Sequence, residues 1–182
     1  MALLLAAACG GEEAPAVDPD AHIGAVREVL REIDARNYDA DAVVDYLKKG
    51  SYNTLCLNAG GIVDFFQNPL PAANVNKLMG DRDLLKEITA ACKKAGIKVI
   101  GRIDFRGAEE HIYQKFPDWF MVDENNQPVV TTYAYEDRVI RLYAGCYLGK
   151  HRNDYANEFV AYVLKNYAVD GIWHNAPGVQ GL

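Results

Sequence analysis

The sequence predicts an α/β fold built around a parallel β-sheet. Three segments each combine helically spaced apolar residues, a break and a β-branched run: 41–58, 83–105 and 153–175. Successive helix-to-strand units of this kind form parallel strands joined by right-handed crossovers. The clearest strand is Lys98–Phe105, whose middle is β-branched and whose far end carries Arg102 and Asp104. The chain has 182 residues, fewer than the roughly 250 of a closed (β/α)8 barrel.

Each predicted helix has an apolar stripe and is followed by a predicted strand. The helices cover 41–49, 83–95 and 153–167. The strands that follow them cover 52–58, 97–105 and 169–175. Gly50 and Gly96 end the first two helices, as glycine commonly does at a helix C terminus. Asp170 precedes the last strand, where we expect it to fix the turn that enters the sheet.

Two regions are less regular. In residues 21–35 the apolar spacing favours a helix, although 29–34 is also compatible with a short first strand. The connection 105–151 is too long for an ordinary loop, and we expect it to fold over the sheet as a substrate-binding device. Within it the sequence predicts a helix over 108–116, a hairpin and one more strand. The hairpin would pair 119–122 with 129–133, and the extra strand would cover 139–143.

The first twenty residues differ from the rest of the chain. An apolar run leads into Cys9, and an acidic, proline-containing stretch follows it. This pattern resembles a bacterial lipoprotein signal in which Cys9 is lipidated. It departs from that pattern because no Lys or Arg precedes the run and Ala6 stands where Leu is usual. We therefore expect a signal-like segment and linker over 1–20, a folded domain over 21–182, and export to the cell envelope or periplasm. The alternative is an alanine-rich disordered tail.

Composition excludes several classes of partner. The net charge is −6 and the pI is about 5.2, and Lys and Arg cluster only as two lysine pairs, which argues against nucleic acid. The four cysteines and four histidines have neither the spacing of a zinc site nor that of a disulfide framework. We therefore expect neither a cofactor nor a metal.

Five short motifs occur in a fixed order: REID at 31–34, NAGGI at 58–62, GRIDF at 101–105, FPDWF at 116–120 and DGIWHN at 170–175. Together they resemble hypothetical glycosyl hydrolase family six, a bacterial group within the (β/α)8-barrel glycosidases. The resemblance implies that 31–34 is the first strand, against the helical spacing. It also implies that the four strands end at Asp34, Asn58, Asp104 and Asn175.

The resemblance implies a partial TIM barrel, the amino-terminal half, with a long elaborated loop after the third strand. Four strands alone leave open sheet edges. We therefore expect the chain to be a fragment of a longer gene product, or else to form a homodimer that completes its sheet. The resemblance further implies a carbohydrate substrate and hydrolysis of glycosidic bonds by carboxylate acid/base chemistry.

Glycoside hydrolysis needs two carboxyl groups that flank the bond. Asp104 is the best candidate for one of them, because it stands at a strand's carboxyl end beside Arg102. Arg102 could hold Asp104 ionised or bind the sugar, and the alternative is that the two residues form a structural ion pair. We expect the second carboxyl group to lie beyond Leu182.

The other candidates are substrate-binding residues: Asp34, Asn58, Arg102, Trp119, His174 and Asn175. Asn175 occupies the place where several barrel glycosidases carry a nucleophilic Asp, and we expect its amide to bind a sugar hydroxyl. Trp119 offers a flat face for stacking, although aromatic residues are more often core. For His174, packing and catalysis are equally compatible with the sequence. The rival functions are a non-catalytic carbohydrate-binding lipoprotein and a dimerising half-barrel module.

Overall fold

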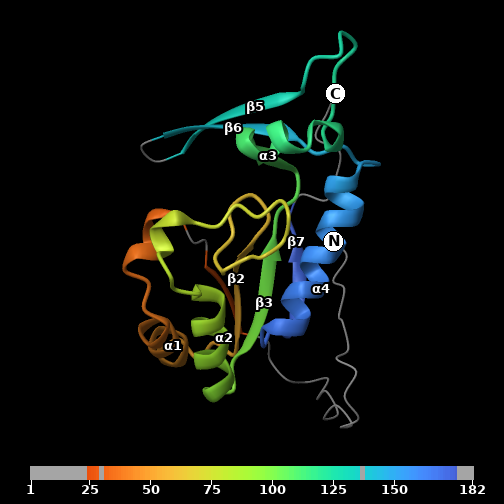
Figure 1. The fold of residues 1–182 in the computed structure, drawn as a ribbon. Helices are drawn as coiled ribbons and strands as arrows, with labels where there is room; N and C mark the ends of the chain where they lie inside the picture. The colour runs from red at the N-terminus through yellow and green to blue at the C-terminus, as the bar shows by residue number, and fades with distance from the viewer. Residues whose placement is uncertain (1–23, 29–30, 136–137, 176–182) are drawn as a thin grey trace.

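The structure is a computed structural model that describes residues 24–28, 31–135 and 138–175. Cys9 and the signal-like segment predicted over 1–20 lie outside the described residues. The main sheet has four parallel strands in the order β1-β2-β3-β7. Their bounds are Ala25–Glu28, Thr54–Gly60, Lys98–Ile103 and Gly171–His174. The parallel α/β sheet predicted from the sequence is confirmed, and these four strands do not close into a barrel (Figure 1).

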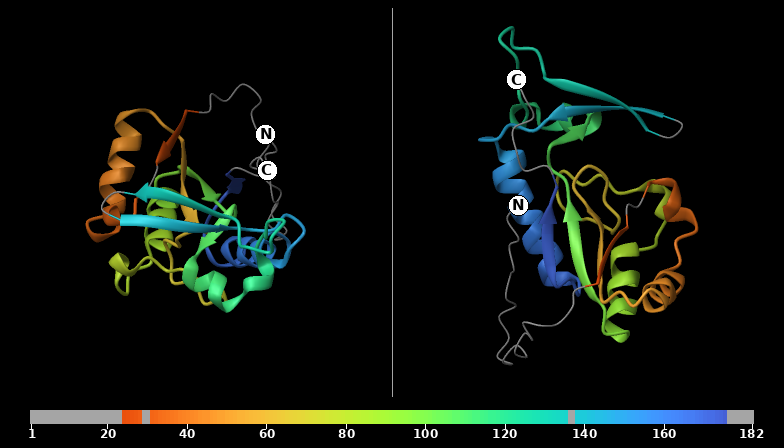
Figure 2. Two further views of the ribbon diagram at one scale, coloured as in Figure 1. Left: turned by 90° about the horizontal axis from the view of Figure 1, so that it is seen from above. Right: turned by 180° about the vertical axis from the view of Figure 1, so that it is seen from behind.

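Three helices connect the strands: α1 (Ala40–Lys49), α2 (Leu84–Lys94) and α4 (Ala156–Asn166). A one-turn π-helix, His151–Tyr155, leads directly into α4. The side chains of Asp39 and Asp83 accept backbone N–H groups at the starts of α1 and α2, which satisfies donors that have no partner within a helix. Seen from above, the helices lie around one side of the sheet (Figure 2). None of the helices within the described ranges has the length and apolar character that crossing a membrane requires.

The strands divide their side chains between two faces. Alternate residues of β2 and β3, including Leu55, Leu57 and Val99, pack against the apolar stripes of α1 and α2. Further along, Ala59 and Ile103 pack against α4. Because successive side chains of a strand point to opposite faces, the residues between them face away from the helices. That second face, which we call the inner face, carries the polar residues of the candidate site.

The first strand lies earlier in the chain than either sequence interpretation placed it. β1 covers Ala25–Glu28, while Ile33–Arg36 forms a short 3-10 helix. The helix predicted over 21–35 and the strand predicted over 31–34 are therefore both wrong. The physical reason is local: Asp34 accepts the backbone N–H of Arg31 at 2.9 Å and its guanidinium at 2.7 Å, which closes this segment into a turn.

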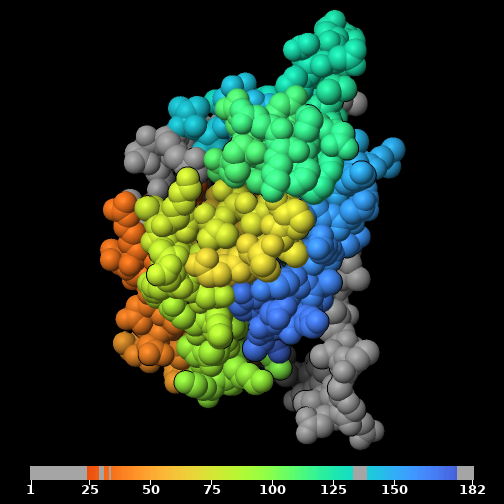
Figure 3. All heavy atoms as spheres, in the orientation of Figure 1, coloured from red at the N-terminus to blue at the C-terminus, as the bar shows by residue number. Residues whose placement is uncertain are grey.

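The segment after β3 forms a second layer beyond the carboxyl ends of the parallel strands (Figure 1). Its antiparallel sheet has the order β4-β6-β5, and α3 (Glu110–Lys115) follows β4. The strand bounds are Gly107–Glu109, Arg138–Ala144 and Val130–Tyr135. Figure 3 shows this layer packed directly on the loop that follows β2. Lys115 Nζ donates to the Pro71 carbonyl at 2.8 Å, and Asn74 Nδ2 donates to Glu109 at 3.1 Å.

The predicted hairpin forms only next to its turn, where the Val129 N–H donates to the Met121 carbonyl at 3.0 Å and Val122 bridges Pro128. β5 pairs with β6 rather than with 119–122, where Phe120 and Val122 form only isolated bridges. Pro117 begins a 3-10 turn that ends at Trp119 and interrupts any strand there. Asp123 then accepts the backbone N–H groups of 125 and 127 at 2.8 Å, which folds the following residues into a tight turn.

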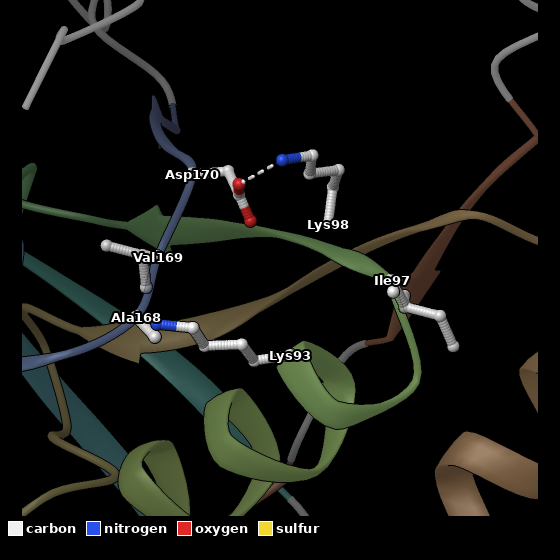
Figure 4. Close-up of a pocket in the computed structure, with 7 residues that line it drawn as sticks. Lys93, Ile97, Lys98, Ala168, Val169 and Asp170 are labelled. Carbon is white, nitrogen blue, oxygen red and sulfur yellow. Dashed lines mark hydrogen bonds and ion pairs between the residues drawn. The ribbon is translucent and has the colours of Figure 1, made fainter. Parts of the chain in front are cut away.

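Asp170 joins the amino ends of β3 and β7. One carboxylate oxygen accepts the backbone N–H of Val99 at 2.8 Å, and the other accepts Lys98 Nζ at 2.9 Å. The backbone N–H of Asp170 donates to the Val99 carbonyl at 2.7 Å. Figure 4 shows this ion pair at the edge of a cavity of about 300 Å³ that Lys93 also lines. The arrangement lies at the end of the sheet opposite the candidate site, so its role is structural.

We expect Asp170→Ala to lower the free energy of unfolding by about 1–3 kcal/mol, because the Val99 amide loses its charged acceptor. Asp170→Asn keeps an acceptor oxygen and should cost less. Lys98→Ala removes only an exposed ion pair and should cost less than about 1 kcal/mol. Urea unfolding of the three variants measures these differences. Equal costs for Asp170→Ala and Lys98→Ala would show that the backbone contact contributes nothing.

Candidate functional site

Asp104 is the centre of a polar cluster at the carboxyl end of β3. Its side chain is only 7% exposed, and Oδ2 lies 3.7 Å from Arg102 Nη2 and 3.6 Å from Arg106 Nε. The backbone N–H of Arg106 donates to Oδ1 at 3.2 Å, and Asn175 Nδ2 donates to Oδ2 at 2.8 Å. The backbone of Asp104 is held as well, because its N–H donates to the Gly60 carbonyl at 3.1 Å. The carboxylate is thus fixed in position and balanced by two guanidinium groups.

Two neighbouring strands bring further groups to this cluster. Arg102 Nη1 donates to Asn58 Oδ1 at 2.8 Å, and the sheet register sets these two residues side by side. On the other side, the backbone N–H of Asn175 donates to the Ile103 carbonyl at 2.8 Å and extends the pairing of β7 with β3. The structure therefore brings together Asn58, Arg102, Asp104 and Asn175 from three adjacent parallel strands. We call these four residues the rim cluster.

A glycine allows the backbone of the next loop to approach Asp104. Gly61 has a φ of +113°, and a Cβ atom there would lie 2.3 Å from the Asp104 carbonyl oxygen. Only glycine accommodates both the dihedral angle and the close approach. The register between β2 and β3 shifts just before this point, between Asn58 and Gly60, as occurs at β-bulges beside active sites.

The loop that contains Gly61 is organised by a buried acid that sequence reasoning missed. Asp64 is 1% exposed and accepts hydrogen bonds from the Gly61 N–H at 3.0 Å, Asn68 Nδ2 at 2.8 Å and the Asn74 N–H at 3.0 Å. Burial raises the pKa of the Asp64 carboxyl, and these three donors oppose that shift. Asp64 therefore holds the loop against the rim cluster from behind. Its isolation within an irregular loop left no periodic signal in the sequence.

Comparison with models of protein families identifies the family of this chain. The family model described as "Hypothetical glycosyl hydrolase 6" matches residues 39–176, well over half of the sequence. The chain belongs to this family. The matched range contains all four members of the rim cluster. A comparison with curated proteins finds no significant match.

Solved structures share the fold of this family member. The alpha-L-fucosidase isoenzyme 2 from Paenibacillus thiaminolyticus is 22% identical with a TM-score of 0.63, covering 83% of this chain and 23% of that one. A maltogenic alpha-amylase, AmyB from Thermotoga neapolitana, is 19% identical with a TM-score of 0.60, covering 88% and 39%. A hypothetical protein from Ruminiclostridium thermocellum is 12% identical with a TM-score of 0.60, covering 82% and 75%. At these identities the likeness concerns the fold alone.

The chain therefore spans less than half of the fucosidase and of the amylase that it resembles. It corresponds to part of a larger glycoside hydrolase barrel, which confirms the partial barrel that the motifs implied. Within the described residues, no group of three or more His, Cys, Asp and Glu side chains is arranged to hold a metal ion.

In this glycosyl hydrolase family member, His174 lies behind the rim. It ends β7 beside Ile103, on the helix-facing side of the sheet, and its ring lies 6.3 Å from that of Phe105. Burial lowers the pKa of His174, and the nearby positive charge of Arg152 lowers it further, while Asp104 opposes the shift. The imidazole is thus kept neutral at pH 7, and its role in substrate binding stays a prediction.

The structure places the other two sequence candidates away from the cluster. Asp34 is engaged by Arg31 in a local ion pair, whose hydrogen bond lowers the pKa of the Asp34 carboxyl. Trp119 stacks on Phe116 with ring centroids 4.1 Å apart, and its ring also lies 5.8 Å from that of Tyr155. These contacts join Trp119 to the core behind the rim. A sugar-binding role for either residue stays a prediction.

His151 was not singled out by the sequence analysis, yet it is 1% exposed. Its ring packs among those of Phe105, Phe120 and Tyr155, and its Nδ1 is buried without a hydrogen-bond partner. Burial lowers its pKa from 6.5 to about 4, and the charge of Arg152 adds to the shift. The histidine therefore packs in its neutral form against the segment that leads out of the rim.

The burial of His151 predicts that the folded protein loses stability in acid. The pKa of His151 is lower in the folded state than in the unfolded state. The stability that the neutral side chain contributes is therefore complete above pH 6.5 and is lost as the pH falls through about 4. We expect the loss to approach about 3 kcal/mol. Urea unfolding at several pH values between 7.5 and 4 measures it. His151→Gln should unfold with a shallower pH dependence than the natural protein, and identical slopes would contradict the assignment.

Proposed function

We propose that the protein acts on carbohydrate as a glycoside hydrolase and that the rim cluster is its sugar-binding site. The observation that carries the proposal is the convergence of carboxylate, guanidinium and amide side chains at the carboxyl ends of β2, β3 and β7. Ligands of α/β barrels bind at this end of the strands. Membership of a glycosyl hydrolase family supports the reaction class.

The chemistry follows from how each group is held. In the proposal Asp104 is an ionised carboxylate that accepts a sugar hydroxyl or stabilises positive charge on the sugar as the glycosidic bond breaks. Two of its lone-pair positions are used by Arg106 and Asn175, which leaves acceptor capacity for a ligand. Asn58 and Asn175 offer amide groups for neighbouring hydroxyls. Hydrolysis needs a second carboxyl group besides Asp104.

One observation favours a second candidate function, carbohydrate binding without hydrolysis. Asn175 ends β7 and directs its amide at Asp104, 2.8 Å from the carboxylate. An amide is neither a nucleophile nor a proton donor of useful acidity, so this position supplies binding but no bond cleavage. The two functions share one site and differ in turnover alone.

The test is a panel of glycosides given to the full-length protein, with release of reducing sugar and sugar-induced NMR shifts measured together. Turnover accompanied by shifts at Asn58, Asp104 and Asn175 supports hydrolysis at the rim cluster. Shifts at these residues without product support the binding function instead. If no sugar perturbs them, the proposal that this rim binds carbohydrate is wrong.

A further inference from the structure

On the inner face of the sheet, side chains from the first and fourth strands meet. Adjacent strands lie about 4.8 Å apart, so β1 and β7, separated by two strands, would be roughly 14 Å apart in a flat sheet. The guanidinium carbon of Arg27 on β1 nevertheless lies 5.6 Å from the centre of the Trp173 ring on β7. These two long side chains therefore reach across the inner face and contact each other over β2 and β3.

The strand register places a second guanidinium on the same face. Arg27 stands beside Cys56, which is two residues before Asn58 and therefore faces the same way. Asn58 pairs with Arg102, and Arg102 pairs with Trp173. Arg27, Arg102 and Trp173 thus share the inner face, close to the carboxyl ends of their strands.

Positive charge is concentrated around Arg102 on the inner face. Arg27, Arg102 and Arg106 lie close enough together that the charges of Arg27 and Arg106 add to the effect of burial in lowering the pKa of Arg102. Asp104 is the carboxylate that opposes them. Among the described residues, three arginines therefore gather near one carboxylate in a chain whose net charge is −6. The side chain of Arg102 is 16% exposed, and its Nε is buried without a hydrogen-bond acceptor.

A bound anion would balance the positive charge and would give the buried Nε of Arg102 a hydrogen-bond acceptor. A partly buried cation is stabilised by an anion that hydrogen-bonds to it, and guanidinium groups bind carboxylate and sulfate through two parallel N–H groups. Trp173 adds a flat apolar ring of the kind on which sugar rings stack. The chemistry of this part of the inner face therefore matches a sugar that carries a negative charge rather than a neutral one.

We propose that the inner face between Arg27, Arg102 and Trp173 binds an acidic sugar, whose carboxylate or sulfate is held by the two arginines while its ring lies on the tryptophan. This inference rests on the proposed carbohydrate function and narrows it to a substrate class.

The experiment compares three probes by calorimetry with the full-length protein: methyl β-D-glucuronide, glucose 6-sulfate and neutral methyl β-D-glucoside. We expect one or both anionic sugars to bind at least tenfold more tightly than the neutral one, and the tighter of the two identifies the anionic group. Raising the salt concentration should weaken the anionic sugars alone, because screening acts on the charged interaction.

Two variants test whether Arg27 causes the preference for anionic sugars. Arg27 is exposed, so Arg27→Gln should leave the fold intact and remove most of the preference for the anionic sugar. Arg36→Gln removes the same charge from an exposed position outside the inner face and should leave the preference unchanged. Equal binding of charged and neutral sugars, or equal effects of the two variants, would overturn this inference and leave the proposed function standing. If none of the three sugars nor any glycoside of the panel binds, the proposed function itself fails.

Discussion

Asp104→Asn is expected to lower glycoside turnover by the full-length protein about 10²–10³-fold, the range for removing one group that stabilises charge in the transition state. Asparagine keeps the shape of the side chain but removes the charge that balances Arg102 and Arg106 at 3.7 and 3.6 Å. The loss should fall mainly on kcat, because the amides of Asn58 and Asn175 remain to bind sugar hydroxyls. Initial rates over a range of substrate concentrations separate the two parameters.

The control for this substitution is Asp118→Asn. Asp118 lies on the same segment after β3 and also carries one negative charge, but it is exposed in the short 3-10 helix that ends at Trp119. Its replacement should change neither kcat nor KM. Urea unfolding of both variants guards against a loss that comes from misfolding. If Asp104→Asn folds and turns over glycosides at the natural rate, Asp104 does no chemistry and its arginine contacts are structural.

The parallel core and the rim cluster could be predicted because both follow from local pattern and one geometric rule. β3 is a buried run with its charges at one end, and the carboxyl ends of parallel strands meet at the same edge. Asn58, Arg102, Asp104 and Asn175 therefore had to be neighbours once their strands were recognised. The contacts that join them agree with that expectation.

β1 escaped prediction because it is short and its residues alternate between exposed and half-buried, so it lacks an apolar run. The roles of Arg27 and Trp173 escaped for a different reason. They are far apart in sequence and on strands that do not pair, and their side chains meet only across the inner face of the folded sheet. Asp64 was missed because its hydrogen-bond partners lie in an irregular loop with no repeating pattern.

Gly61→Ala is expected to lower the free energy of unfolding by more than about 3 kcal/mol and to abolish sugar binding at the rim. An alanine Cβ at this position would lie 2.3 Å from the Asp104 carbonyl oxygen and 2.8 Å from the carbonyl carbon, where the obstacle is backbone rather than a movable side chain. The β2 loop or the end of β3 would have to move. Either movement displaces the Asp104 carboxylate from its partners.

Gly80→Ala separates the clash from the cost of the backbone conformation. Gly80 also has a positive φ, +58°, but a Cβ atom there would meet nothing within 4 Å. Its replacement should therefore cost only the backbone strain, about 1–3 kcal/mol, because φ +58° with ψ −132° is a combination that residues with a side chain rarely adopt. Urea unfolding and sugar titration of the two variants give the comparison. Because both substitutions add the same methyl group, a larger loss at Gly61 measures how tightly the second loop is packed against Asp104, and equal losses would mean that this approach can relax without disturbing the rim cluster.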